Sequence, residues 1–521
     1  MKNIANIINF VRATDPRDDA VDLLGTTRNE LMLCREYGFK STVLLQYDAL
    51  IDSRYTDLCK EYSHSLDIGI WLEIVEPLVK DAGMEWKGRW SWDWHNNVGF
   101  SVGYIPEERK KLIDVFFYKF KEIFGYFPAA ASSWHIDALT LEYMWKKYNI
   151  TASCNCKDQY GTDGYTMWGG YYNGAYYPSK TNMFCPAQTR ENQIGVPVFR
   201  MLGSDPIHQY DWGMGKAGSY DPSGCQGVIS LEPVYRPGGG SEDWVNWYFW
   251  ENFNGKNLSF SYTQVGQENS FGWEAINKGL KIQFEIMKKL VNKGRLEILT
   301  LKESGEWFKM EYDETPAAVM CIESDFSDED YKTVWYYNKY YRTNLLYQKG
   351  CLWIRDIYLF NENFREKYID RREESKDCAY FNLPVMDGFR YSKGKIRAGI
   401  YPYTSGVQII NSSGEFKVKE TGKDSLEVSV GDDLRYLIEE KQIVISSSIS
   451  DWGLMLEYYA SDNITYKEFK EKKLFMEFAG NTGVVCKYSI SLTKGRFNVE
   501  NGKVHIIPEN GKICIVLADG L

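Results

Sequence analysis

The chain lacks the features that mark several large classes of protein. No segment approaches the roughly 18 consecutive apolar residues of a transmembrane helix, so we expect no membrane association. No block of Lys and Arg is present and the formal net charge is −10, which argues against nucleic-acid binding because such proteins must neutralise phosphates. The 11 cysteines show neither zinc-type pairs nor a CxxC redox motif, so reduced, buried thiols are expected.

The amino-terminal sequence also lacks the pattern of a secretory leader. The segment MKNIANIINFVRATDPRDD has no apolar core followed by a small-residue cleavage site, and we therefore expect a cytoplasmic protein. Histidine is scarce as well, with five residues in 521. The stretch SSWHIDALTLEYMWKKY contains one of them, His135, and raises the question of its role.

Aromatic residues, in contrast, are abundant: they make up 16% of the chain and include 17 Trp and 38 Tyr. Aromatic faces pack against the apolar C–H faces of sugar rings, and sugar-binding clefts are often lined in this way. An aromatic-rich core explains the composition equally well. We also expect a homodimer, because large apolar surfaces left exposed favour association. One cluster of aromatic residues on a loop is predicted to form, in part, a cleft wall or a subunit contact: Trp86, Trp90, Trp92, Trp94 and His95.

The first 300 residues alternate short apolar runs with helical patterns, as βα units around a parallel sheet or barrel do. Strands are predicted in NIINFVRA, STVLLQYDAL, DIGIWLEIV, AAASSWHID and NLSFSYTQV. Helices are predicted in TTRNELMLCREYG, YTDLCKEYSH, IPEERKKLIDVFFYKFKEIFG, ALTLEYMWKKYN and WEAINKGLKIQFEIMKKLVNKG. Residues 154–245 show few periodic segments, and an irregular stretch of this length in a compact domain is usually functional.

After about residue 310 the pattern changes to alternating strands separated by turn signals, as in GVQIINSSGEFKVKETGKDSLEVSVGDDLRYLIEEKQIVISSS. This pattern is typical of an all-β domain, most simply a sandwich. The predicted fold class is therefore α/β: a (β/α) barrel at residues 1–308, followed by an all-β sandwich domain at residues 309–521.

Four candidate catalytic residues follow predicted strands, at the end of the barrel where barrel enzymes place their chemistry. Asp15 follows the first strand, although an Asp in a turn is also common there. His135 and Asp137 are two residues apart, so extended geometry puts both side chains on one side, and a carboxylate there would raise the pKa of a His base. A core histidine and a helix N-cap explain the same pair. Glu73 ends the third strand. Three interpretations fit it: a proton donor, a nucleophile, or a solvated residue at the junction between strand and loop.

The first half of the chain resembles the barrel of the polysaccharide deacetylase superfamily. An Asp-bearing loop follows the first strand, STVLLQ is similar to the second strand of that family, and EIFGYFPAAASSWHIDALTLEYMWKKYNI is similar to its Gly–Pro–strand–helix stretch. The resemblance covers roughly residues 5–155. Those deacetylases bind a metal through an Asp–Asp pair and an H-x-x-x-H motif, and this chain has no H-x-x-x-H.

Within this group the chain is more similar to a small family of inverting exo-sialidases, which pair such a barrel with a C-terminal β domain. The matching residues are Asp15 in VRATDPRDD and His135 in SWHIDA. The resemblance implies that Asp15 protonates or stabilises the departing glycosidic oxygen of a sialoglycan, while His135, oriented by Asp137, activates a water. Acid and base would then lie about 6.5–9.5 Å apart, and neither a metal nor another cofactor is needed.

The same resemblance implies binding residues for a sialic acid, whose carboxylate favours a bidentate Arg. Arg200 is the first candidate, although pairing with Asp205 would explain it equally well. Arg12 and Arg17 come next. The remaining predicted substrate-binding residues lie in loops near the expected site or in the β domain: Trp134, Asp205, His208, Glu268 and Asn344.

Three other functions fit the same residues. Glu73 and Asp137 would form the carboxylate pair of a retaining glycosidase if they lay about 5–5.5 Å apart. The aromatic clefts alone would suit a carbohydrate-binding protein without catalysis. A metal-dependent deacetylase would draw its ligands from Asp18, Asp19, His95 and His135.

Overall fold

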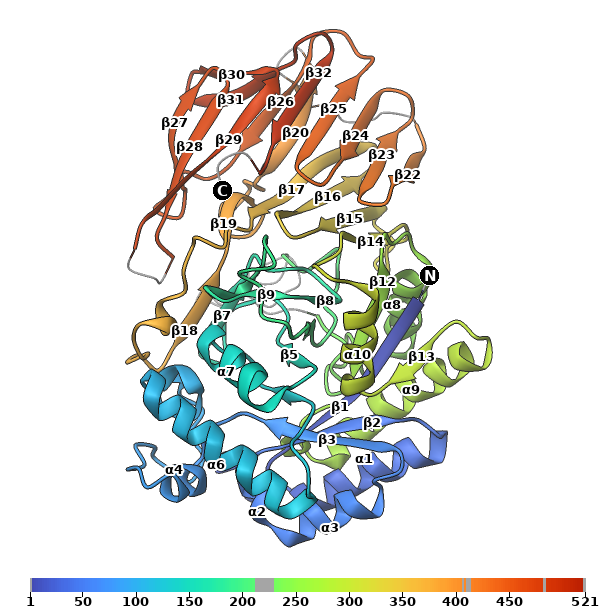
Figure 1. The fold of residues 1–521 in the computed structure, drawn as a ribbon. Helices are drawn as coiled ribbons and strands as arrows, with labels where there is room; N and C mark the ends of the chain where they lie inside the picture. Colours follow the sequence, from blue (N-terminus) through green and yellow to red (C-terminus); the bar gives the residue numbers. More distant parts are fainter. Residues whose placement is uncertain (1, 211–228, 405–406, 409–413, 481–483, 519–521) are drawn as a thin grey trace.

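The parallel strands expected in the first 300 residues form one side of a barrel. The computed structural model describes residues 2–210, 229–404, 407–408, 414–480 and 484–518. The strand order of the main parallel sheet is β12–β1–β2–β3–β4, with β13 (Glu297–Leu299) also paired to β1. The expected α/β class is confirmed, and the parallel strands form a half-barrel where a barrel was expected (Figure 1). The strands are β1 (Lys2–Val11), β2 (Ser41–Leu45), β3 (Leu66–Trp71), β4 (Ala131–Ser132) and β12 (Phe260–Val265).

Helices cover the outside of this sheet, and burial explains why its strands are apolar. Residues of β1 and β2 are buried on both faces, as in other parallel sheets covered by helices. Gly38 (φ 68°) and Gly125 (φ 84°) end two of the helices in the left-handed conformation. None of the helices in the described part of the chain combines the length and apolar character needed to cross a bilayer. The main helices are α1 (Leu23–Tyr37), α3 (Ser53–Glu61), α6 (Pro106–Phe124), α7 (Ala138–Tyr148) and α9 (Trp273–Asn292).

Two predicted strands are shorter than expected. The strand predicted in STVLLQYDAL ends at Leu45, and α2 (Tyr47–Ile51) follows almost directly. In this helix the Asp48 carboxylate accepts hydrogen bonds from the backbone N–H groups of Ala13 and Thr14, so α2 fixes the loop after β1. The strand predicted in AAASSWHID pairs only over the two residues of β4.

In the described residues of the segment from 154 to 245, where few periodic segments were expected, the chain forms short strands and the start of helix α8 (Glu242–Asn254). β5 (Ser153–Asn155) and β11 (Val198–Arg200) pair in parallel and extend the half-barrel beyond β4. Helix α8 was not predicted, because it carries aromatic residues on both its buried and its exposed side: Trp244 is buried and Trp250 is exposed. A helix that is apolar on several sides gives no amphipathic period.

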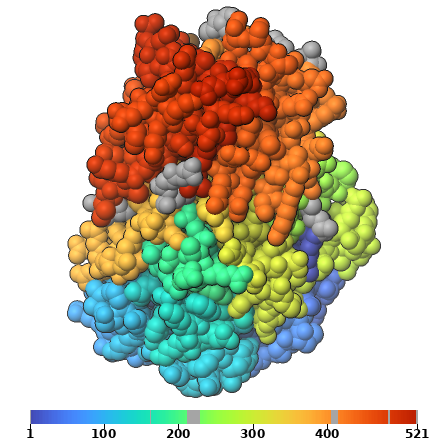
Figure 2. Space-filling view, turned by 45° about the horizontal axis from the view of Figure 1, so that its top comes forward, coloured from blue at the N-terminus to red at the C-terminus, as the bar shows by residue number. Residues whose placement is uncertain are grey.

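The last 200 residues form two large antiparallel sheets in the described ranges, which confirms the expected β-rich C-terminal region (Figure 1). The two sheets contact each other: the Tyr436 hydroxyl donates to the carbonyl oxygen of Leu352. In the space-filling view this region lies directly against the N-terminal half (Figure 2). The main path of the first β sheet is β14 (Ala318–Ile322), β15 (Tyr331–Tyr337), β16 (Tyr341–Gln348), β17 (Cys351–Leu359), β20 (Gly399–Thr404), β26 (Trp452–Glu457), β31 (Lys503–Ile507) and β30 (Arg496–Glu500). The second is β22 (Phe416–Gly422), β23 (Ser425–Val430), β24 (Leu434–Ile438), β25 (Gln442–Ser447), β32 (Lys512–Val516), β29 (Cys486–Lys494), β28 (Lys473–Phe478) and β27 (Tyr466–Lys470).

The chain returns from these sheets to the half-barrel between residues 361 and 382. There β18 (Cys378–Phe381) pairs in parallel with β7 (Tyr165–Trp168), close to α7 and away from the first β sheet (Figure 1). The Asn96 side chain also donates to the carbonyl oxygen of Lys376 (3.0 Å). This returning segment therefore brings C-terminal residues to the barrel. The boundary between residues 308 and 309 stays a prediction.

A buried arginine ties the returning segment to the barrel. The side chain of Arg109, in α6, has no solvent-accessible surface. Its guanidinium donates to the Asp137 carboxylate (2.9 Å) and to the carbonyl oxygens of Tyr368 (2.6 Å) and Arg371 (3.4 Å). Removing one partner of a buried ion pair is strongly destabilising, because the other charge stays buried without compensation.

We expect Arg109→Met to lower the free energy of unfolding by about 3–5 kcal/mol, because Asp137 would lose its guanidinium partner. Urea-induced unfolding followed by circular dichroism measures the change. The matched control is Arg54→Met, since Arg54 pairs with Asp52 at the surface and its loss should leave unfolding nearly unchanged. Equal effects of the two substitutions would contradict the role of Arg109 as a structural tie.

Candidate functional site

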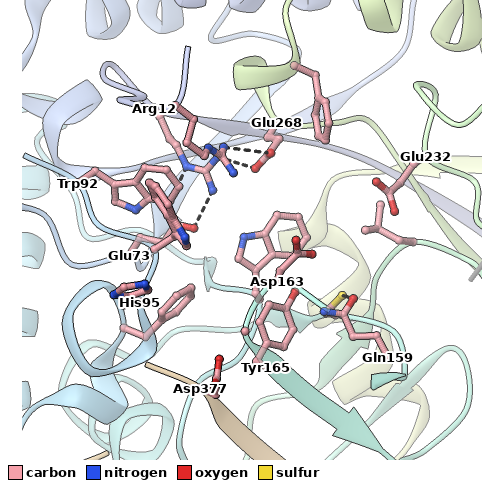
Figure 3. Close-up of a pocket in the computed structure, with 18 of the residues that line it drawn as sticks. Arg12, Glu73, Trp92, His95, Gln159, Asp163, Tyr165, Glu232, Glu268 and Asp377 are labelled. Atoms are coloured by element: carbon pink, nitrogen blue, oxygen red, sulfur yellow. Dashed lines mark hydrogen bonds and ion pairs between the residues drawn. The ribbon is translucent and has the colours of Figure 1, made fainter. Parts of the chain in front are cut away.

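A cavity of about 520 Å³ opens at the carboxyl ends of the half-barrel strands (Figure 3). We call it the mouth cavity. Strands β1, β3, β4, β5, β11 and β12 each contribute a residue that lies one to three positions after the strand ends. These residues are Arg12, Glu73, Trp134, Lys157, Leu202 and Glu268. The convergence follows from the parallel sheet, because the carboxyl ends of its strands lie on one edge.

The Arg12 guanidinium holds two carboxylates at this edge. Its Nε and Nη2 donate to the two carboxylate oxygens of Glu73 (2.9 and 2.8 Å), and its Nη1 donates to Oε2 of Glu268 (2.6 Å). The Gln46 amide also donates to Glu73. All three charged side chains are almost fully buried. Figure 3 shows Arg12 between the two carboxylates.

Aromatic side chains form much of the remaining wall. The Arg12 guanidinium lies over the ring of Trp92, 4.3 Å from its centroid, and Arg17 lies over the same ring at 4.8 Å. Of the Trp cluster expected to form a cleft wall, Trp92 and Trp94 do line the cavity, together with His95. Further aromatic lining residues are Phe100, Trp134, Tyr165 and Phe271.

Two glutamates of the cavity have pKa values moved in opposite directions. Burial raises the pKa of Glu268 above its usual value, although Arg12 and Arg17 oppose this. Burial would also raise the pKa of Glu232, but the Lys157 ammonium at 3.1 Å outweighs it and holds this pKa below its usual value. The Gln267 amide donates to Glu232 as well (3.5 Å). The two carboxyl groups thus differ in the direction in which their surroundings shift the pKa.

Several lining residues were not predicted from the sequence. Lys157 lies two residues after the end of β5, and a correct prediction of that strand would have indicated it. Glu232 and Asp163 lie in loops with no periodic signal. Lys376 and Asp377 reach the cavity only through the returning segment, so no local pattern could have indicated them.

Asp15 lies next to the mouth cavity but is engaged by arginine. The Arg17 Nε donates to its Oδ1 at 2.9 Å, and Arg12 lies 4.0 Å away. Burial would raise the pKa of Asp15, but the hydrogen bonds from Arg17 lower it below the usual value. A carboxyl held in the ionised form is a poor proton donor, so this geometry gives the predicted acid role no support.

His135 and Asp137 lie outside the residues that line the mouth cavity. His135 is buried, with its Nε2 2.8 Å from Asn96 Oδ1 and 3.5 Å from Cys378 Sγ. Burial lowers its pKa to about 3, against the attraction of Asp137. The Asp137 carboxylate binds Arg109 and accepts the capping hydrogen bond from Thr140, so it acts as the N-cap of α7. The expected His base and the expected Glu73–Asp137 pair are therefore not assembled at the cavity.

The other predicted binding residues divide into two groups. Arg12, Arg17, Trp134 and Glu268 line the mouth cavity. The other four make structural contacts elsewhere. Arg200 binds Asn155 and Asp158, and the Asp205 carboxylate accepts a hydrogen bond from the backbone N–H of Ile207. His208 contacts Asp325, and Asn344 donates a hydrogen bond to Thr333 within the first β sheet.

The half-barrel is similar to solved structures of carbohydrate-active proteins. A suggested glycoside hydrolase/deacetylase from Parabacteroides distasonis matches with 15% identity over 73% of this chain and 91% of its own, at a TM-score of 0.50. Weaker matches are a suggested polysaccharide deacetylase from Mycobacterium smegmatis (11% identity, 60% and 91% coverage, TM-score 0.35) and a family 4 acetyl xylan esterase from Clostridium thermocellum (10%, 59% and 92%, 0.25). No family model and no curated protein matches the chain.

The expected membership of the inverting exo-sialidases is wrong. The solved structure that matches at a TM-score of 0.50 is described as a glycoside hydrolase/deacetylase and not as a sialidase, and no family model supports a sialidase. The predicted sialidase mechanism and the predicted sialoglycan substrate depend on that membership and are wrong as well. The resemblance to the deacetylase barrel is confirmed at the level of the fold.

The described residues do not fit the metal of the deacetylases. Among them, no group of three or more His, Cys, Asp or Glu side chains is arranged to hold a metal ion. Asp18 and Asp19 are exposed in the turn after β1, and His135 is buried behind the cavity wall. The Arg12 guanidinium binds Glu73 and Glu268, so these two carboxylates at the strand ends are already engaged.

We expect Arg12→Met to destabilise the protein more at about pH 8 than at about pH 5. Without the guanidinium, burial would raise the pKa of Glu268 further above its unfolded-state value. A carboxyl with a raised folded-state pKa favours folding while it is protonated, and this contribution is lost as the pH rises through that pKa. The Tm of variant and wild type, measured at both pH values, gives the comparison.

Arg17→Met is the control for this prediction, because Arg17 is partly exposed and pairs mainly with Asp15. Its pH-dependent change in Tm should be smaller. A difference in Tm between Arg12→Met and wild type that is the same at both pH values would contradict the role assigned to Arg12.

Proposed function

We propose that the protein is a carbohydrate-modifying enzyme that hydrolyses a bond of a saccharide bound in the mouth cavity. The observation that carries this proposal is the opposite shift in pKa of Glu268 and Glu232. Environments that move the pKa values of two carboxyl groups apart provide a proton donor and a proton acceptor at the same pH. Glu268 is then the general acid and Glu232 the general base.

The shape and lining of the cavity support a sugar as the ligand. Its volume of about 520 Å³ lies within the range of small-molecule sites, about 300–1,000 Å³. Trp94, Trp134 and Tyr165 offer aromatic faces, against which the C–H faces of a sugar ring pack. Charged groups between these rings provide hydrogen-bond partners for hydroxyl groups.

In the proposed reaction, side chains of the mouth cavity supply both proton-transfer groups, and no metal is required. Glu268 in its protonated form donates a proton to the leaving oxygen or nitrogen atom of the substrate. Glu232, kept ionised by Lys157, accepts a proton from the attacking water. Arg12 orients Glu268 through the 2.6 Å hydrogen bond and stabilises the carboxylate that forms when the proton is transferred.

The first bond to test is that of an acetyl group on a sugar. Deacetylation is one of the two activities named in the description of the similar solved structure from Parabacteroides distasonis. A panel of N- and O-acetylated oligosaccharides, followed by NMR, detects released acetate and new reducing ends in one experiment. The product identifies which bond is hydrolysed.

We expect Glu268→Gln and Glu232→Gln each to lower kcat/KM at least about 100-fold on any substrate that this panel identifies, because each removes one proton-transfer group. The matched control is Glu274→Gln, an exposed glutamate six residues further along the chain, which should keep wild-type activity. Wild-type rates in both cavity variants would refute the assignment of acid and base.

The pH dependence of kcat/KM gives a separate prediction. Glu268 must be protonated, so the rate should fall as the pH rises through its raised pKa. Glu232 must be ionised, so the rate should fall again as the pH drops through its lowered pKa. In Glu268→Gln the fall at higher pH should disappear from the residual rate. A profile that keeps this fall in the variant would assign it to another group.

A second candidate function is saccharide binding without turnover. The specific observation in its favour is that Glu73, Glu268 and Glu232 are all ion-paired already. Saturable binding of an oligosaccharide, measured by calorimetry and weakened in Trp134→Ala, would favour this function if no product forms with any member of the panel.

A further inference from the structure

A second cavity, of about 690 Å³, lies on the first β sheet. We call it the sheet cavity. None of the described residues lines both this cavity and the mouth cavity. Five neighbouring strands contribute lining residues: β15, β16, β17, β20 and β26. Ile207 and Tyr210, from the segment after β11, complete the lining. The sheet cavity therefore lies mainly on the β region and does not belong to the site described above.

The floor of the sheet cavity is one face of the sheet. Cys351, Trp353 and Arg355 alternate along β17, so their side chains point to the same face. Leu352 lies between them, is fully buried, and its carbonyl oxygen accepts a hydrogen bond from Tyr436 of the second β sheet. The cavity thus lies on the face that points away from the second β sheet.

Two stacked aromatic rings form a platform in this floor. The rings of Trp353 and Tyr401 have centroids 5.4 Å apart and are inclined by 21°. Gly399 makes this arrangement possible: a Cβ atom there would lie 2.9 Å from Trp353 Cδ1 and 3.0 Å from Tyr401 Cε2. Trp353 is partly exposed, and its ring is available to a ligand in the cavity. Such platforms suit the apolar faces of sugar rings.

The described lining of the sheet cavity is strongly cationic. It contains one carboxylate, Glu457, and four basic side chains. Lys349 and Lys395 are exposed, and neither has an ion-pair partner among the described residues. Arg355 is held rigidly: its Nε donates to Asn344 Oδ1 at 2.7 Å. The fourth basic residue is Arg397. By comparison, carboxylates and basic groups in the mouth cavity nearly balance.

We propose that the sheet cavity is a second saccharide-binding site and that it takes an anionic oligosaccharide, one that carries carboxylate or sulfate groups. The Trp353–Tyr401 platform binds a sugar ring, and Lys349 and Lys395 bind its acidic substituents. A neutral glycan would use only the platform. The site does not depend on the reaction in the mouth cavity, because it requires binding alone.

Isothermal titration calorimetry with three tetrasaccharides tests the proposal: tetragalacturonate, its fully methyl-esterified form and a sulfated galactan tetramer. At low salt we expect at least one charged probe to bind about tenfold more tightly than the esterified, uncharged probe. The two charged probes distinguish a carboxylate from a sulfate as the source of the negative charge. Raising the salt concentration should weaken binding of the charged probes only.

Variants locate this binding. Trp353→Ala should weaken it by about tenfold, because the platform is lost. Lys395→Gln should weaken it less and reduce its dependence on salt. Because Lys395 is exposed, this second variant retains a folded protein even if Trp353→Ala does not. The matched controls are Trp250→Ala and Lys278→Gln, exposed residues on α8 and α9, which should bind like wild type.

Three results would overturn the proposal. The first is equal affinity for charged and uncharged probes. The second is loss of binding in Trp94→Ala, a mouth-cavity variant, but not in Trp353→Ala. The third is a change in oligomeric state of Trp353→Ala, measured by sedimentation velocity, with saccharide binding unchanged, since this would assign the face to a protein contact. Failure of hydrolysis in the mouth cavity would leave all three measurements interpretable.

Discussion

The chemistry of the mouth cavity depends on one buried guanidinium. Two carboxylates brought close together at one edge of the sheet would repel each other, and each would lose its hydration on burial. The planar fork of Arg12 satisfies Glu73 through two hydrogen bonds and Glu268 through one. Lysine could not do this with the same geometry, because its ammonium is a single point charge. The sheet places these groups on one edge, and Arg12 makes their proximity stable.

Three of the predicted residues that line the mouth cavity follow strands that are buried along most of their length. They are Arg12, Glu73 and Glu268, which come after β1, β3 and β12. In a parallel sheet the end of a strand fixes the position of the next residues, so a correct strand prediction is nearly a site prediction. The two-part layout could be predicted because the sequence pattern changes after about residue 310 from alternating strands and helices to strands alone. The expected homodimer and the cytoplasmic location stay predictions.

Sequence reasoning failed where long-range contacts decide the position of a side chain. His135 was placed by assuming an extended strand through residue 137, but β4 pairs over only two residues and the chain then turns His135 behind Phe100, whose ring stacks on it at 4.5 Å. Lys376 lies more than 100 residues in sequence from every cavity residue of the half-barrel, and the pairing of β18 with β7 brings it there. Neither event leaves a periodic pattern in the chain.

The structure also shows why a shared fold does not settle the reaction. A metal-dependent site at this edge needs neutral or anionic ligands that converge on one point, and a guanidinium at that point repels the cation. Here Arg12 pairs with both Glu73 and Glu268. In the proposed reaction the proton-transfer groups are two carboxyls whose local environments differ. Lys157 beside Glu232 and the burial of Glu268 supply that difference, with the half-barrel serving as the frame that holds both.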